Sequence, residues 1–153
     1  MKYKLTIIIS LVFCAISQLT TIAQEKQWLS YEPEPVALAG RLIVQTKFGP
    51  PNFGENPKTD QRVRVPIVVL TKPINVRGTP GAVHNATSVE GARRIQLLFS
   101  DPAMNYKSLV GKDIVVKGTL FHAETGGHYT DVVMSVQSIE LKKRGRAAAV
   151  PGH

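Results

Sequence analysis

Short apolar runs, separated by stretches rich in proline and glycine, recur along the chain after Pro35. Runs of this length that alternate or are rich in β-branched residues, and that are bounded by turn-forming residues, are typical of strands. Their positions predict five strands, at residues 36–46, 62–70, 92–99, 112–123 and 131–141. The pattern therefore indicates an all-β domain that is mostly antiparallel.

Irregular loops and one short helix are predicted between these strands. Residues 48–59 contain three prolines and two glycines, and residues 71–90 contain two of each, which favours loops over regular structure. Asp101 followed by proline is typical of a helix start, and Gly111 of a helix end. A short helix is therefore predicted at residues 101–109.

The order strand, strand, strand, short helix, strand, strand is that of a five-stranded OB-fold barrel. Gly40 predicts a bulge or a tight bend in the first strand, and Pro66 predicts an edge position or a bulge in the second. An open antiparallel sheet and a small sandwich are the alternatives. In the OB fold, ligands usually contact strands two and three and the loops that join strands one to two and four to five. Here those loops are residues 48–59 and 124–127.

The two ends of the chain are predicted to lie outside this domain. Residues 1–23 begin with two lysines, continue with an apolar run and end in small residues, as in a cleaved secretory signal. The run is shorter than a membrane-spanning helix needs. Residues 24–35 are an extended lead-in, residues 36–141 the single barrel domain, and residues 142–153 a basic disordered tail. We expect an exported protein, periplasmic or secreted, that meets the membrane only during export.

Charge and cysteine content narrow the classes of function. The chain has 19 Lys plus Arg against 11 Asp plus Glu, a formal net charge of +8. Much of this surplus lies in the signal and in Lys142, Lys143, Arg144 and Arg146 of the tail, so the domain itself is nearly neutral. A nearly neutral domain disfavours nucleic-acid binding. Cys14 is the only cysteine and lies in the signal, so the exported domain has neither a disulfide nor a thiolate ligand.

The alternation of side chains predicts which residues share a face at the last hairpin. Leu120 and Val132 both face the core if the connecting loop has an odd number of residues, such as 125–127. In that register four polar residues lie on the core-facing side beyond the apolar layers, where they line one mouth of the barrel. They are His122, Glu124, His128 and Thr130.

Two imidazoles and a carboxylate at one mouth suit a proton acceptor and donor pair or a divalent metal site. Zinc at a catalytic site takes three protein ligands, for which His122, Glu124 and His128 are the candidates. Asp131 is a weaker candidate because it falls on the other face. In the interpretation that we favour, the histidines only cap the end of the barrel, since no complete ligand motif is present. No cofactor is therefore expected.

The loop after the first strand supplies the other candidate residues. Aromatic and amide side chains on a segment stiffened by proline bind a ligand at low entropic cost. The candidates are Phe48, Asn52, Phe53, Asn56 and Asp60. In the alternative interpretation, Phe48 and Phe53 fold back and plug the barrel. Trp28 and Tyr31 are expected to pin the lead-in to the barrel rather than to stack on a ligand.

Several segments together resemble a known family. They are the YEP sequence at Tyr31, the glycine-containing first strand, residues 48–60 and residues 118–132. The chain resembles the uncharacterised bacterial family called domain of unknown function 4431, and the resemblance covers most of the chain after the signal. The resemblance implies an exported protein and no established activity or cofactor. Members tend to be richer in histidine around the hairpin, where this chain has Glu124 and Tyr129.

Three hypotheses of function follow from these patterns. The first is an exported non-enzymatic binding module of the OB type, whose ligand is a protein, a glycan fragment or a small molecule such as an anion. The second is a histidine-based, metal-dependent hydrolase. The third, single-stranded nucleic-acid binding, requires stacking aromatics and a basic groove. Strands two and three offer Arg62, Arg64, Arg93 and Arg94 but only Phe99 as an aromatic residue.

Overall fold

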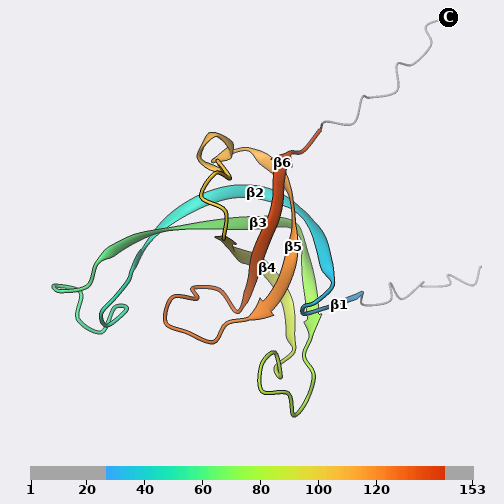
Figure 1. Ribbon diagram of the computed structural model, residues 1–153, viewed down its shortest axis with the longest axis horizontal. Helices are drawn as coiled ribbons and strands as arrows, with labels where there is room; N and C mark the ends of the chain where they lie inside the picture. The colour runs from blue at the N-terminus through green and yellow to red at the C-terminus, as the bar shows by residue number, and fades with distance from the viewer. Residues whose placement is uncertain (1–26, 144–153) are drawn as a thin grey trace, which may run out of the picture.

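A computed structural model describes residues 27–143 of the chain (Figure 1). The predicted signal peptide at residues 1–23 and the predicted tail beyond residue 143 lie outside the described residues. Within residues 27–143, no helix is long and apolar enough to cross a membrane.

The described residues form six strands and a single turn of 3-10 helix. The elements are β1 (Trp28–Ser30), β2 (Pro35–Phe48), β3 (Arg62–Arg77), β4 (Val89–Phe99), η1 (Lys107–Leu109), β5 (Asp113–His122) and β6 (Val132–Leu141). Strands β2 to β6 correspond to the five predicted strands, and β1 lies in the predicted lead-in. The all-β prediction is therefore confirmed.

The predicted helix at residues 101–109 is wrong in extent, because only the 3-10 turn at its end forms. Asp101 does not cap a helix. Its carboxylate Oδ1 accepts a hydrogen bond from the backbone N–H of Ala103 at 2.8 Å. Aspartate commonly stabilises a turn in this way, and such a turn competes with helix formation.

The strands close into a barrel. The sheet order is β1-β3-β2-β5-β6-β4, and an additional pairing of β3 with β4 joins the two sides. The β4–β6 pair is parallel, whereas the other pairs within the barrel are antiparallel. Strand β1 adds to β3 in parallel, outside the barrel. The five-stranded barrel predicted from the element order is therefore confirmed, and its sheet is mixed but mostly antiparallel.

Strand β2 pairs with β5 along its first half and with β3 along its second half, and Gly40 lies where the two pairings overlap. Residues 35–41 of β2 pair with β5, and residues 40–48 pair with β3, so Gly40 has a partner on each side. A Cβ atom at Gly40 would overlap the carbonyl oxygen of Val69 and lie 2.8 Å from Cγ2 of Val68. Glycine is therefore required by the close approach of the neighbouring strand.

Strand β3 continues beyond its predicted end. Residues 71–77 were expected to be loop, but β3 runs through Pro73 to Arg77. Two register shifts against β4, on either side of Ile74, bend the strand there so that Val76 is fully buried. Pro66 lies at a strand edge on one side only, as predicted in part. It pairs with β2 on one side, whereas on the other side the β3–β4 ladder ends at Ile67.

The outer parts of β2 and β3 project from the barrel as a two-stranded arm, which comprises residues 43–48 and 62–66 (Figure 1). Along the arm the two strands pair with each other. Neither has a second partner there, because β2 leaves β5 after Arg41 and β3 reaches β4 only at Ile67. The arm carries the loop of residues 49–61, called here the first loop.

The core lies inside the barrel and consists of alternate residues of each strand. Leu42, Ile95, Ile114, Leu120 and Met134 are fully buried there. The core also includes one residue that precedes the barrel, Tyr31, whose hydroxyl donates to the carbonyl oxygen of Thr87 at 3.2 Å. Tyr31 thus joins the segment after β1 to the loop between β3 and β4, as expected of a residue that pins the lead-in.

In the last hairpin, even-numbered residues pair with each other, as side-chain alternation predicts. Leu120 pairs with Met134, and His122 pairs with Val132. The connection spans residues 123–131 rather than the expected 125–127, so it is an irregular loop. We call it the hairpin loop.

Replacement of Leu120 by Ala should lower the free energy of unfolding by about 2 to 5 kcal/mol, because the buried side chain leaves a cavity. Urea unfolding followed by circular dichroism measures the loss. His122→Ala is the comparison, since His122 is only half-buried at the end of β5. An equal loss for both variants would contradict the assignment of His122 to the edge of the core.

Candidate functional site

A row of side chains crosses the outer wall of the barrel. Ile67 of β3 pairs with Gln96 of β4, Gln96 with Val133 of β6, and Val133 with Phe121 of β5. Although these residues point away from the core, Ile67 and Val133 are almost completely buried and Gln96 is only 4% exposed. The wall is therefore covered from outside.

The hairpin loop contributes to this cover, and Gln96 attaches it to the wall. The side-chain Nε2 of Gln96 donates to the carbonyl oxygen of Gly127 at 2.9 Å, and its Oε1 accepts from the backbone N–H of Tyr129 at 2.6 Å. The backbone N–H of Gln96 donates to Oγ1 of Thr130 at 2.9 Å. One buried amide thus makes two hydrogen bonds to a loop that has no regular structure of its own.

The predicted shared face for His122 and His128 is wrong. The His122 ring lies edge-on to the core residue Tyr31, with centroids 6.3 Å apart. The His128 ring instead packs on Phe121 of the outer wall, with centroids 5.4 Å apart. The loop is long enough to fold back, so the alternation of the strands does not continue through it.

The side chains of the other members of the predicted mouth cluster each contact a different group. Glu124 lies 2.9 Å from Nδ1 of His84, in the loop between β3 and β4. Nδ1 of His128 accepts from the backbone N–H of Glu124 at 2.9 Å, and the hydroxyl of Thr130 donates to the carbonyl oxygen of Val132 at 2.7 Å. Within residues 27–143, no three His, Cys, Asp or Glu side chains come together in a way that could hold a metal ion.

Asp60 organises the first loop. Its Oδ1 accepts from the backbone N–H and the side-chain amide of Asn52 at 2.9 and 3.2 Å, and its Oδ2 accepts from the N–H of Gly54 at 2.7 Å. Desolvation raises the pKa of Asp60, but the hydrogen bonds donated to its carboxylate outweigh it, so the pKa lies below its ordinary value. Of the predicted ligand-binding residues, Asn52 and Asp60 therefore bond to each other within the loop. The backbone carbonyl of Asn56 accepts from the backbone N–H of Asp60 at 3.1 Å.

The two predicted aromatic residues of this region do not plug the barrel. Phe48 lies at the end of the arm, where the Arg62 guanidinium sits 3.7 Å from its ring centroid. Phe53 is 42% exposed and has a positive φ of 52°, a conformation uncommon outside glycine. The alternative in which both rings fill the barrel interior is therefore wrong.

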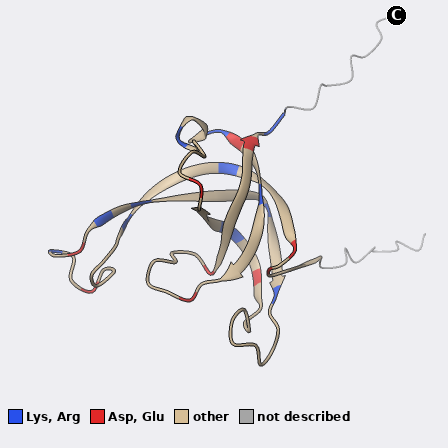
Figure 2. Ribbon diagram, viewed as in Figure 1, with Lys and Arg blue, Asp and Glu red and all other residues tan. Residues whose placement is uncertain are grey.

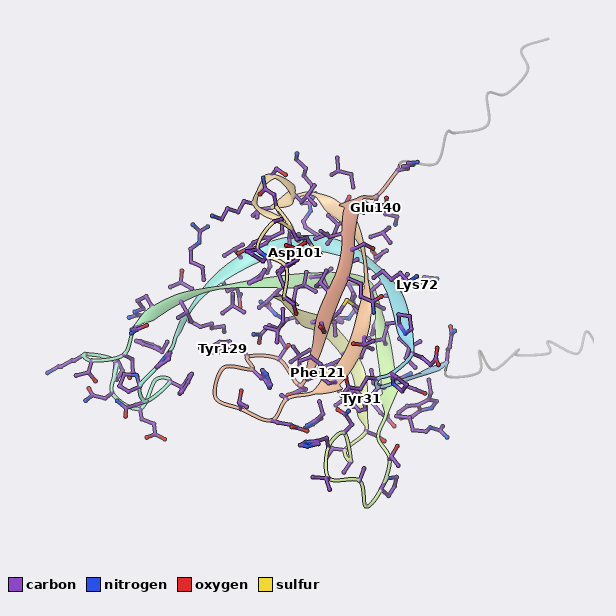
Figure 3. All side chains as sticks on the ribbon, in the orientation of Figure 1. Tyr31, Lys72, Asp101, Phe121, Tyr129 and Glu140 are labelled. Carbon is purple, nitrogen blue, oxygen red and sulfur yellow. The ribbon has the colours of Figure 1, made fainter. Side chains whose placement is uncertain are left out.

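The first loop and the hairpin loop meet. A Cβ atom at Gly126 would lie 2.9 Å from the Phe53 ring, so glycine allows the ring to rest against the hairpin loop. The hydroxyl of Tyr129 donates to the carbonyl oxygen of Phe48 at 2.7 Å. In Figure 3, Tyr129 lies between the arm and the barrel, on the hairpin loop. Residues far apart in sequence are thus joined into one surface.

Between these two loops lies an open groove of about 580 Å³. It crosses the outer face of β3 and β4, and its lining is mainly apolar. Its lining includes Phe53, Val63, Arg64, Pro66, Gln96, Leu97, Leu98, Gly126 and Tyr129. This groove lies where the OB fold was expected to present its ligand site. Sequence reasoning found both loops but missed Gln96, which gives no signal in the sequence beyond a polar residue in an apolar strand.

Comparison with known proteins adds a family. Residues 94–140 match the family described as a domain of unknown function (DUF4431). Over this segment the match bears out the resemblance seen in the sequence. No curated protein matches the chain. The matched segment includes Gln96, the hairpin loop and the strands on either side of it.

Gln96→Leu should release the hairpin loop from the wall. The substitution leaves the Gly127 carbonyl and the Tyr129 N–H without their partner, at a cost of about 1 to 3 kcal/mol. Hydrogen exchange should show faster exchange at Tyr129 than in the wild type. Gln137→Leu, at an exposed position of β6, is the matched control. Equal exchange at Tyr129 in Gln96→Leu and wild type would contradict the attachment.

The Asp60 carboxylate should stabilise the first loop only while it is ionised. Because its folded-state pKa is depressed, this contribution is present above the unfolded pKa of about 3.9 and is lost as pH falls through the lower folded value. The amide chemical shifts of Gly54, followed by NMR during acid titration, should report a midpoint below the ordinary aspartate value. Asp60→Asn should remove this titration, and a midpoint above that value would overturn the account.

Proposed function

We propose that this protein is an exported, non-enzymatic binding module whose ligand lies in the groove between the first loop and the hairpin loop. The observation that carries the proposal is the convergence of the two loops. Contacts between Phe53 and Gly126 and between Tyr129 and Phe48 hold them together over β3 and β4. A largely preformed concave surface with mainly apolar walls is the usual form of a small-molecule site.

The lining of the groove supports binding rather than catalysis. The side chains that form it include no carboxylate, imidazole or thiol among the described residues. The pair formed by His84 and Glu124 is exposed and does not line the groove. The groove therefore supplies shape and apolar area, together with one cationic side chain, that of Arg64.

The ligand that fits this lining best is a small molecule with an apolar or aromatic body. Phe53, Val63, Pro66 and Leu98 offer apolar contact, and removal of such surface from water is favourable by about 25 cal/mol per Å². Asp60 fixes the first loop through three hydrogen bonds to its carboxylate, so little further ordering is needed when a ligand binds. An exposed aromatic residue on a loop fixed in this way is well suited to stack on a flat ligand.

N-phenylnaphthylamine, a neutral aromatic probe that fluoresces in apolar surroundings, should bind the protein in a saturable manner. Phe53→Ala should weaken this binding by about fivefold or more, because one aromatic wall of the groove is lost. A fluorescence titration measures both affinities.

Val83→Ala is the control for this experiment, since Val83 is 92% exposed in the loop between β3 and β4 and does not line the groove. It should leave the affinity unchanged. Absence of saturable binding, or equal effects of the two substitutions, would overturn the assignment of the groove as the ligand site.

A further inference from the structure

A second hollow adjoins the groove. It has a volume of about 500 Å³ and lies against the outer side of β4, with Gln45 and Lys47 of the arm at another wall. Tyr129 lines both this hollow and the groove, so the two share a boundary. The hollow differs from the groove in chemistry, because charged and polar side chains form most of its lining. We call it the polar hollow.

Two successive arginines line the polar hollow, which a regular strand would not allow. Ala92 and Ile95 of β4 both pack toward the core, although they are three residues apart. The register shifts between β3 and β4 on either side of Ile74 account for this departure from alternation. Arg93 and Arg94, which lie between the two inward residues, are therefore both exposed and both reach the hollow.

The carboxylates in the wall of the polar hollow match only part of its positive charge. Lys47, Arg93 and Arg94 form no ion pair with any residue in the described part of the chain. Two acidic residues, Glu90 and Asp131, also line the hollow. Three cations thus face two carboxylates, and Figure 2 shows basic residues both on the arm and along β4.

One of these carboxylates also acts on the interior. Burial, and after it the negative charge of Asp131, raises the pKa of Tyr31 to about 12. Asp131 therefore lies close enough to Tyr31 for its negative charge to disfavour ionisation of the Tyr31 hydroxyl. The two arginines follow each other on β4, so their guanidinium groups can together face an anion in the hollow.

We infer that the polar hollow is an anion subsite of the groove, and that the ligand is a small amphiphile with an apolar or aromatic body and a carboxylate, sulfonate or phosphate end. The body occupies the groove and the anionic end lies in the polar hollow beside Arg93 and Arg94, with Tyr129 between them. This inference rests on the proposed function of the groove. It adds the charge of the ligand and the residues that select it.

Two related fluorescent probes test the inference separately from the proposed function. Anilinonaphthalene sulfonate has the same aromatic body as N-phenylnaphthylamine but carries a sulfonate. The anionic probe should bind the wild type more tightly than the neutral probe does. Arg94→Gln should weaken binding of the anionic probe by about threefold and the double variant Arg93→Gln/Arg94→Gln by about tenfold, which are the effects expected of exposed charge pairs. Neither variant should change the affinity for the neutral probe.

Lys117→Gln is the matched control, because Lys117 is exposed on β5 and lines neither the groove nor the polar hollow. It removes the same charge and should leave both affinities unchanged. Added salt should weaken binding of the anionic probe and leave binding of the neutral probe unchanged. The anion subsite is refuted if the neutral probe binds but the anionic probe does not bind more tightly. It is also refuted if Lys117→Gln weakens binding of the anionic probe as much as Arg94→Gln does. In both cases the groove remains the proposed ligand site. If neither probe binds, both the subsite and the proposed function fail.

Discussion

The buried amide of Gln96 is the constraint on which the candidate site depends. Gln96 pairs with Ile67 in the outer wall of the barrel, and its side-chain amide bonds to Gly127 and Tyr129 of the hairpin loop. A buried amide is costly unless its partners are present, so the loop and the wall stabilise each other. Because Tyr129 is fixed by this contact, its hydroxyl can reach the Phe48 carbonyl and position the arm. The groove exists only when both loops are held.

The first loop is held by a second, independent network. The Asp60 carboxylate gathers the N–H groups of Asn52 and Gly54, and this places Phe53 on the side that faces Gly126. The site is thus built from two loops that are each ordered internally and then touch. Such a surface loses little freedom on binding, which favours recognition of a small ligand over a disorder-to-order transition.

The sequence predicts the barrel well because its signals are local. Alternation located five strands, and counting predicted that even-numbered residues of the last hairpin pair with each other. Gly40, which was expected to mark a bulge or a bend, lies in two ladders without a register shift and is instead required by the close approach of β3. The site was less predictable, because irregular loops do not obey alternation. His122 and His128 separate for this reason, and Asp60 bonds to its own loop. Gln96 and the partner of Glu124, which is His84, depend on contacts between distant segments that no local pattern encodes.

The placement of the groove outside the barrel has a consequence for how the protein can vary. The core is formed by inward residues such as Leu42 and Met134, whereas the groove uses outward residues of β3 and β4 together with the two loops. The two sets meet mainly at Leu97, which is buried and also lines the groove. Side chains such as Phe53 and Arg94 can therefore change without opening a cavity in the core. A barrel built in this way can change the lining of its groove while it keeps its fold, and any function of the groove then resides in that lining rather than in the architecture.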